Sequence, residues 1–321
     1  MEADLRQRLE TLDLVEFHID SLIDNSVTDF DVFIRIQGEI VLYGAAGYRW
    51  FRQEISDLLG FGYTSLLVRR EDQVKTRTYL NLARLPLLQK NLAPSERINV
   101  IDNIGTEFLK CVYDTPLVEG VIERGKTLAK EIADCIEEDP GSVKFLNHLV
   151  EHDSYTYRHS IRVAMFAVAI SMGLGISDSE RLHDIALGGI FHDIGKKGVS
   201  LEVLNKPGVL TKSEWEILRT HPKNGWLDVK DTILSHVPRE IILHHHEKRN
   251  GSGYPDGLDR HSLLHEVQVA TLADIFDALT SNRAYQSRRT PFEALSFIKT
   301  KLVGEEVSSE AFKALVQVLA Q

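Results

Sequence analysis

Histidines and aspartates of the types that bind metals recur through the second half of the chain. Residues 244–258, HHHEKRNGSGYPDGL, place three histidines just before a loop with three glycines. Imidazoles are common metal ligands, and glycine lets a backbone approach a ligand closely. Neighbouring residues of a helix point about 100° apart. We therefore expect His245 and His246 to flank one metal while His244 points elsewhere.

A His-Asp pair closes an apolar, helix-like stretch at residues 188–198, GGIFHDIGKKG. His192 and Asp193 fall at the end of this stretch, Gly195 follows as a helix stop, and Lys196 comes next. A His-Asp pair at a helix end can direct an imidazole to one ion and a carboxylate between two ions. His183-Asp184 lies mid-helix without the following Gly-Lys, so we assign it no ligand role.

Two further histidines are candidate ligands. His159 shares a helical face with Val163 and Phe166, so it points towards the core, where a hydrogen-bonded core histidine is the alternative. Thr211 and Glu214 could form a capping box for a helix that we expect to end at His221, before Pro222. The alternative there is a histidine that interacts with its own helix C-terminus.

Asp274 is the second candidate carboxylate. It shares a face with Val267, Ala270 and Ala278, and a buried carboxylate needs a strong partner. That partner could be a metal or, as the alternative, an arginine such as Arg283. Asp277, one turn further, could support a ligand from behind.

Together these candidates supply five imidazoles and two carboxylates: His159, His192, Asp193, His221, His245, His246 and Asp274. The set is sufficient for two metal ions with room for a bridging water. Mixed imidazole and carboxylate ligands suit iron, manganese or zinc rather than calcium or magnesium. Because no thiolate joins the set, a structural zinc site is not expected.

The motifs resemble those of the HD-GYP family, the phosphodiesterases of bacterial cyclic-dinucleotide signalling. The matching segments are HDIGK at 192–196, HHE at 245–247, GSGYP at 251–255 and DIFDALTSNRAY at 274–285. They occur in the family's order over roughly residues 145 to 300. The resemblance implies the same seven metal ligands.

The resemblance also implies roles for residues outside the ligand set. Lys196, Arg283 and Tyr254 fall where the family contacts substrate phosphate or guanine, and Gly251 and Gly253 would let the loop lie against a base or ribose. Two positions depart from the family. Tyr155 stands where some members have a glutamate that helps to hold a third metal, which favours a dinuclear centre, and Asn250 replaces a common aspartate.

The activity implied is hydrolysis of cyclic di-GMP to pGpG or GMP by attack of a metal-bridging hydroxide. Two adjacent divalent ions, iron or manganese, would generate the hydroxide, and with Lys196 they would stabilise the charge on the phosphoryl oxygens. No protein nucleophile is required. Three alternatives stay open: a phosphodiesterase for 3',3'-cyclic GMP-AMP, a cyclic-dinucleotide receptor of low activity, and a simpler HD phosphohydrolase.

The elements that position these residues are mainly helical. From residue 142 to 321 the pattern is almost purely helical, with loops at 195–210 and 247–262, which fits an HD-type domain. Residues 1–90 predict a small α+β domain, regulatory or dimerising, with helices over 3–23 and 50–59 and strands within 30–43 and 65–70. Residues 91–141 predict a helical linker that begins at Pro94 and ends at Asp139-Pro140-Gly141.

Composition limits the classes of partner. A net charge of −10 argues against binding DNA or RNA polymers, which usually needs a basic face. The longest apolar stretch, residues 163–174, is too short to cross a bilayer. Cys111 and Cys135 lack zinc-ligand spacing, and no charged-then-apolar segment begins the chain, so we expect a cytoplasmic protein. A homodimer is left open.

Overall fold

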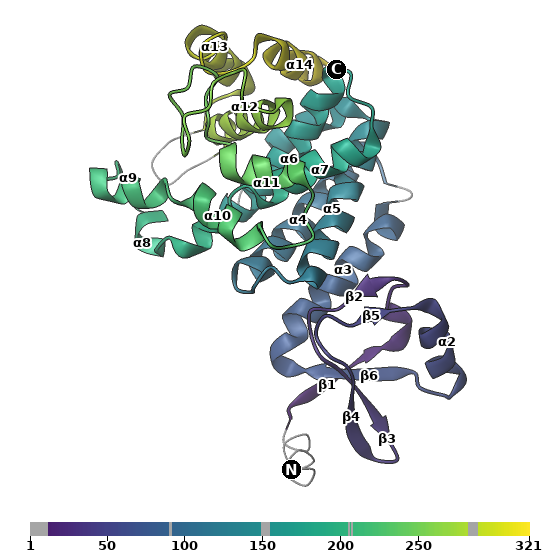
Figure 1. The fold of residues 1–321 in the computed structure, drawn as a ribbon. Helices are drawn as coiled ribbons and strands as arrows, with labels where there is room; N and C mark the ends of the chain where they lie inside the picture. Colours follow the sequence, from purple (N-terminus) through teal and green to yellow (C-terminus); the bar gives the residue numbers. More distant parts are fainter. Residues whose placement is uncertain (1–11, 90–91, 149–154, 205, 207, 282–287) are drawn as a thin grey trace. The chain divides into compact units, whose positions relative to one another are not determined.

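The computed structural model describes residues 12–89, 92–148, 155–204, 206, 208–281 and 288–321. Its contacts divide the chain into two units, which are described separately. The first contains residues 1–87 and 117–124, and the second contains 88–116 and 125–321 (Figure 1). The segment predicted as a linker is therefore shared between the two units rather than standing alone. The predicted boundaries at residues 90 and 141 stay predictions.

The first unit is built on a four-stranded antiparallel sheet in the order β1-β6-β3-β4. Its strands are β1 (Leu14–His18), β3 (Val32–Ile36), β4 (Glu39–Gly44) and β6 (Ser65–Arg69). A short pair joins β2 (Ser26–Val27) to β5 (Arg49–Trp50). Gln37 and Gly38 both take positive φ in the β3–β4 turn, which confirms the predicted hairpin, and β6 confirms the predicted third strand.

The helix expected over residues 3–23 is wrong in its described part. Residues 14–18 form β1, paired antiparallel with β6, and η1 (Ile19–Ser21) is a single 3-10 turn. The β6 partner lies some fifty residues away, so local periodicity gave no sign of it. Residues 3–11 lie outside the described residues. The other predicted helix is present as α2 (Arg52–Gly60).

Helix α3 (Gln73–Gln89) follows η2 (Arg70–Asp72) and contributes Tyr79 to the core of the first unit. The start of α5 (Glu119–Glu138) brings a second anchor. Arg124 donates two hydrogen bonds of 2.6 Å to the two carboxylate oxygens of Asp29, and both side chains are buried. Breaking such a buried pair from one side leaves an uncompensated charge, which is strongly destabilising.

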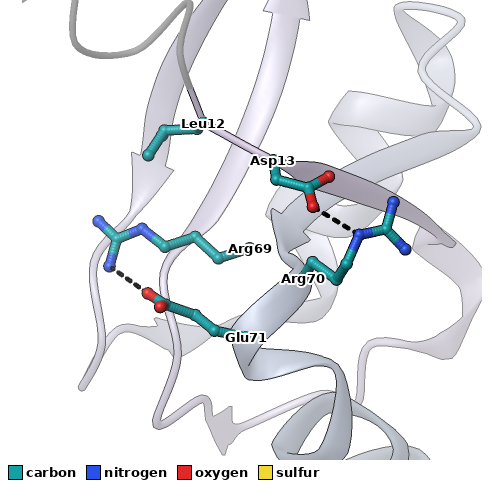
Figure 2. A pocket seen from close by; sticks show the side chains of 5 residues that line it. All are labelled: Leu12, Asp13, Arg69, Arg70 and Glu71. Carbon is teal, nitrogen blue, oxygen red and sulfur yellow. Dashed lines mark hydrogen bonds and ion pairs between the residues drawn. The ribbon is translucent and has the colours of Figure 1, made fainter.

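A shallow pocket in the first unit, drawn in Figure 2, carries paired charges. Arg70 Nε lies 2.6 Å from Asp13 Oδ2, and Arg69 lies 2.9 Å from Asp31 and 3.9 Å from Glu71. Because each guanidinium already has a carboxylate, the pocket offers no unpaired cation to an anionic ligand.

The second unit is all helical among its described residues. Helix α4 (Pro94–Tyr113) begins at the predicted proline and α5 ends at Glu138, as predicted. The other long helices are α6 (Tyr155–Gly173), α7 (Ser179–Phe191), α10 (His221–Val229), α11 (His236–His244), α12 (His265–Thr280), α13 (Pro291–Lys301) and α14 (Ser309–Ala320). The remaining helical segments are η3 (Pro140–His148), η4 (Ile194–Gly198), α8 (Leu201–Leu204) and α9 (Lys212–Leu218).

Helix α6 is the centre of this unit, with α4, α7, α12 and α14 packed around it (Figure 1). Its residues 159–171 are all buried, and residues 163–170 are accordingly apolar on every side of the helix. Gly189 of α7 allows close packing, because a Cβ there would lie 2.6 Å from the Cα of Ala164. The close approach of α6 and α7 brings His159 towards His192. No helix among the described residues is long and apolar enough to span a membrane.

Candidate metal centre

The seven predicted ligands come from five parts of the second unit and meet at its centre. His159 lies on α6, His192 and Asp193 follow α7, His221 begins α10, His245 and His246 follow α11, and Asp274 lies on α12. The donor atoms form two groups, and each group could hold an ion because its atoms all lie within 4.8 Å of one another. The groups are Asp193 with His221, His245 and His246, and Asp193 with His159 and His192. Asp193 belongs to both groups.

Asp274 adjoins both groups as well. Its Oδ1 lies 3.0 Å from Nε2 of His159, and its Oδ2 lies 3.8 Å from Nδ1 of His246. Asp277 lies behind His159, with Oδ2 2.7 Å from Nδ1 of the imidazole. This is the supporting position expected for Asp277. A hydrogen bond from a carboxylate fixes the orientation of an imidazole ligand and raises its basicity.

Gly195 allows the turn that carries His192 and Asp193 to pack closely against His221. A Cβ at position 195 would lie 2.0 Å from the carbonyl oxygen of His221 and 2.4 Å from the amide nitrogen of Gly225. The backbones of η4 and α10 are therefore in direct contact at this point. This contact places Asp193 Oδ1 3.2 Å from His221 Nε2.

In His221 and His245 the hydrogen bond made by Nδ1 leaves Nε2 as an acceptor. Nδ1 of His221 lies 2.7 Å from the carbonyl of Leu218, and Nδ1 of His245 lies 3.1 Å from the carbonyl of Ile241. A carbonyl only accepts, so Nδ1 carries the proton in each ring and a neutral ring keeps a lone pair on Nε2. The two Nε2 atoms face each other at 3.1 Å.

His192 repeats the pattern. Its Nδ1 lies 2.8 Å from the carbonyl of Gly189, and its buried Nε2 has no hydrogen-bond partner among the described residues. That Nε2 lies 3.2 Å from a carboxylate oxygen of Asp193, so a lone pair faces an anion. Buried polar atoms normally find partners, and lone pairs directed at one another repel. A cation among these atoms would satisfy all of them, so the donor set fits metal ions.

Protonation states favour the metal-binding forms of several ligands. Burial lowers the pKa of His246 to about 3, and burial with the nearby His246 and His192 also lowers the pKa of His245. Burial alone would raise the pKa of Asp193, but His192 and Lys196 outweigh it and hold that pKa well below its usual range. Neutral imidazoles and ionised carboxylates are the forms that bind metals.

His159 differs from the other imidazoles. Burial disfavours its charged form, but the hydrogen bonds that its ring donates to Asp274 and Asp277 outweigh this effect and raise its pKa to about 9. Nδ1 and Nε2 of this ring thus face one carboxylate each.

Two side chains hold Asp193 from outside the ligand set. Nζ of Lys196 lies 2.6 Å from Oδ2 of Asp193, and the lysine side chain is one fifth exposed. The hydroxyl of Tyr113, on α4, donates to the carbonyl oxygen of Asp193 at 2.9 Å. Sequence reasoning missed Tyr113, because nothing in a lone tyrosine eighty residues earlier signals this contact.

The loop after α11 lies beside the ligands. The Tyr254 ring stacks on the His246 ring, with centroids 4.8 Å apart and an angle of 28°. Gly251 has φ of 75°, and a Cβ at Gly253 would lie 2.4 Å from the Cα of Glu247, so both glycines are required by the backbone. Arg283, predicted to contact substrate, lies outside the described residues.

Glu247 fixes this loop and had no role in the sequence prediction. Its buried carboxylate accepts hydrogen bonds from the amides of Asp256 at 2.6 Å, Gly257 at 2.9 Å and Leu258 at 3.1 Å. The only sequence signal was its place directly after the histidines. Glu247 therefore ties the loop that carries Tyr254 to the segment that carries His246.

Three further histidines lie outside the cluster or differ from their predicted place on a helix. His244 contacts Glu240 and Asp256 at 3.2 and 3.1 Å and points away from the cluster, as predicted. His183 belongs to neither donor group among the described residues. The helix expected to end at His221 instead ends at Leu218, and His221 begins α10. Pro222 fits there because the first turn of a helix tolerates a missing N–H.

Comparison with known proteins gives matches to the same region. Residues 156–279 match the HD domain family model. A cyclic di-GMP phosphodiesterase of Pseudomonas aeruginosa is 35% identical over 171 residues, which are 52% of this chain and 41% of that protein. One from Thermotoga maritima is 34% identical over 179 residues, 55% of this chain and 48% of that protein.

A 3'3'-cGAMP-specific phosphodiesterase of Vibrio cholerae is 34% identical over 169 residues, 51% of this chain and 35% of that protein. The chain thus spans less than half the length of each of these three relatives. Among solved structures, an HDG"Y"P protein from Bdellovibrio bacteriovorus matches with a TM-score of 0.66 at 20% identity. The match covers 96% of this chain and 100% of that one, and it supports the fold.

Proposed function

We propose that the region around residues 156–279, which matches the HD domain family model, is of the HD-GYP kind, and that the chain is a metal-dependent phosphodiesterase with cyclic di-GMP as its substrate. The relatives from Pseudomonas aeruginosa and Thermotoga maritima, which bear that activity in their names, support this substrate. The products would be pGpG, GMP or both.

The observation that carries the proposal is the set of imidazole Nε2 lone pairs in the buried cluster that no hydrogen-bond donor satisfies. Nε2 of His221 faces Nε2 of His245 at 3.1 Å, and the Nε2 of His192 has no hydrogen-bond partner among the described residues. A purely structural cluster would pair such atoms, because unpaired buried polar groups are costly. A catalytic metal site leaves them for the ion.

We propose that the cluster would hold two divalent ions, iron or manganese, with Asp193 available to both donor groups. One would be held by His159, His192, Asp193 and Asp274, and the other by Asp193, His221, His245 and His246. When bound, such a pair neutralises phosphate charge and supplies an activated water near neutral pH. The donor set contains imidazole and carboxylate without thiolate, which suits these metals.

The protein's own groups orient and neutralise the substrate. His246 and Asp274 are the more exposed of the ligands, at 27% and 12% of their side chains, so the phosphodiester would approach from their side. Lys196 is near enough to stabilise negative charge on the phosphoryl oxygens, because its ammonium already reaches Asp193. Tyr254, Gly251 and Gly253 would contact base or ribose, and Arg283 stays a predicted phosphate contact.

A second substrate is supported by one observation. The Vibrio cholerae relative named for 3'3'-cGAMP is 34% identical, within a percentage point of the two cyclic di-GMP relatives. Overall identity therefore does not separate the two substrates. The two molecules differ by one base, so the residues that contact the bases must decide between them.

The test is turnover of cyclic di-GMP and 3',3'-cyclic GMP-AMP by anaerobically purified protein, with metal content measured on the same sample. We expect hydrolysis with about two ions per chain, loss of activity on treatment with a chelator, and recovery on adding Mn²⁺ or Fe²⁺. If the protein binds metal and nucleotide but does not hydrolyse the nucleotide, it is a cyclic-dinucleotide receptor and not an enzyme. Absence of both binding and turnover would refute the proposal.

A further inference from the structure

The Tyr254 ring contacts two side chains near the candidate metal centre. His246 stacks on it at a centroid distance of 4.8 Å, and the guanidinium carbon of Arg219 lies 4.6 Å from its centroid. Tyr254 therefore connects a candidate metal ligand to Arg219 through ring contacts.

Trp215 also contacts the Tyr254 ring. Its ring lies 6.5 Å from the Tyr254 ring at an angle of 77°, and the residue is 46% exposed. Trp215 lies on α9 and Arg219 directly follows that helix, four residues apart, so both occupy one face. This end of α9 presents an open aromatic surface and a guanidinium beside the metal centre.

The charge on Arg219 is available to a ligand. Arg219 is exposed and forms no ion pair with a carboxylate among the residues that the structure describes. Lys230 provides a comparison: it lies 5.8 Å from the Trp226 ring, but it is also 3.9 Å from a carboxylate oxygen of Asp231. Both Arg219 and Lys230 therefore place a cation near an aromatic ring. They differ because the ring beside Arg219, Tyr254, also stacks on the candidate ligand His246.

We propose that Trp215 and Arg219 form the base-recognition site for one guanine of the cyclic dinucleotide. The inference rests on the proposed function and names the residues that would select the base of the substrate. Stacking on an aromatic ring tolerates any base, so Trp215 supplies affinity. Guanine presents O6 and N7 as adjacent acceptors, which match the two parallel donors of a guanidinium, whereas adenine places a donor at N6. Arg219 therefore selects guanine.

The experiment compares Trp215→Ala, Arg219→Ala and Arg219→Gln with the wild-type chain. Initial rates are measured with cyclic di-GMP and cyclic di-AMP, and binding is measured with a slowly hydrolysed phosphorothioate analogue of each. Lys230→Ala is the control, because it removes a positive charge from another ring. Metal content is measured for every variant.

We expect Arg219→Ala to raise KM and Kd for cyclic di-GMP by about 5- to 100-fold, since a bidentate base contact discriminates by that order. We expect kcat and metal content to change less than about twofold, since Arg219 contacts no metal ligand directly. Arg219→Gln should shift preference towards cyclic di-AMP by about tenfold, because glutamine pairs with adenine N6 and N7. Trp215→Ala should weaken both substrates alike, and Lys230→Ala should match the wild type.

Three outcomes overturn the inference. If the wild-type chain neither binds nor hydrolyses any cyclic dinucleotide, the proposed function fails and this site with it. If the wild type is active but Arg219→Ala keeps its KM and base preference, only the base-recognition site is refuted. If Arg219→Ala loses metal together with kcat, Arg219 supports Tyr254 and His246 structurally and does not read the base.

Discussion

Replacing Glu247 by glutamine tests whether this carboxylate holds the loop of residues 250–258 in place. The carboxylate accepts three backbone N–H groups at 2.6, 2.9 and 3.1 Å while it is 1% exposed. A glutamine can keep its carbonyl oxygen near Asp256 and Gly257, but its amide group then points a donor at the N–H of Leu258. Hydrogen bonds to charged groups contribute about 1.5–3 kcal/mol each, and an unsatisfied buried donor costs about 1–3 kcal/mol.

We therefore expect Glu247→Gln to destabilise the closed loop by about 2 kcal/mol. Since 1.4 kcal/mol is a factor of ten, the amides of residues 256–258 should exchange with deuterium roughly thirtyfold faster than in the wild type. KM for the cyclic dinucleotide should rise severalfold, because the loop carries Tyr254, while metal content stays near the wild-type value. Hydrogen exchange by mass spectrometry and steady-state kinetics measure the two effects.

Glu306→Gln is the matched control. Glu306 is a neighbouring carboxylate that pairs with Lys248 at 2.8 Å and is one quarter exposed, so its loss should change exchange at residues 256–258 little. Unchanged exchange and unchanged KM in Glu247→Gln would refute the reasoning. Equal acceleration in the control would show that any loss of charge loosens the loop.

Four other predictions follow from the structure. Asp193→Ala should abolish turnover and reduce bound metal below one ion per chain with an unchanged circular dichroism spectrum, because Asp193 belongs to both donor groups; near-normal turnover would mean the centre lies elsewhere. Gly195→Ala should weaken metal binding by about 10- to 100-fold, since its Cβ would collide with His221, and titration of the metal-free protein measures this. At pH 8 iodoacetamide should modify Cys111 and not Cys135, because burial raises the pKa of Cys135 to about 11 and only the thiolate reacts; peptide mapping that finds Cys135 alkylated first contradicts this. Deleting residues 1–141 should lose activity while deleting 1–87 keeps the HD region intact, because the larger deletion removes Tyr113 and its hydrogen bond to Asp193; equal activities would show that α4 and α5 are dispensable.

That these histidines and aspartates form one cluster could be predicted from their types and spacing together with the resemblance of the motifs to a known family. Imidazoles and carboxylates on apolar helical faces are costly to bury without a partner, so their repeated occurrence indicated a common ligand. The seven residues chosen on that basis meet at one place, and apart from the helix boundary at His221 they lie on or beside helices, as predicted. Helix periodicity and capping are local properties, and for this reason the sequence reports them well.

Contacts that depend on distant segments could not be predicted. β1 resembled a helix because its partner β6 lies elsewhere in the chain, and His221 resembled a helix end although it begins α10. In both cases the local sequence allows two structures, and packing against another segment selects one.

The sequence determined which atoms could bind metal and which loop could meet a substrate, because both depend on side-chain chemistry and on glycine in the backbone. The tertiary structure decided the arrangement: Asp193 belongs to both groups of candidate ligands, Glu247 holds the loop, and Tyr254 contacts both His246 and Arg219. These contacts join helices that are far apart in the chain. Their geometry follows from how closely the helices pack, which glycines such as Gly195 permit and which no local pattern encodes.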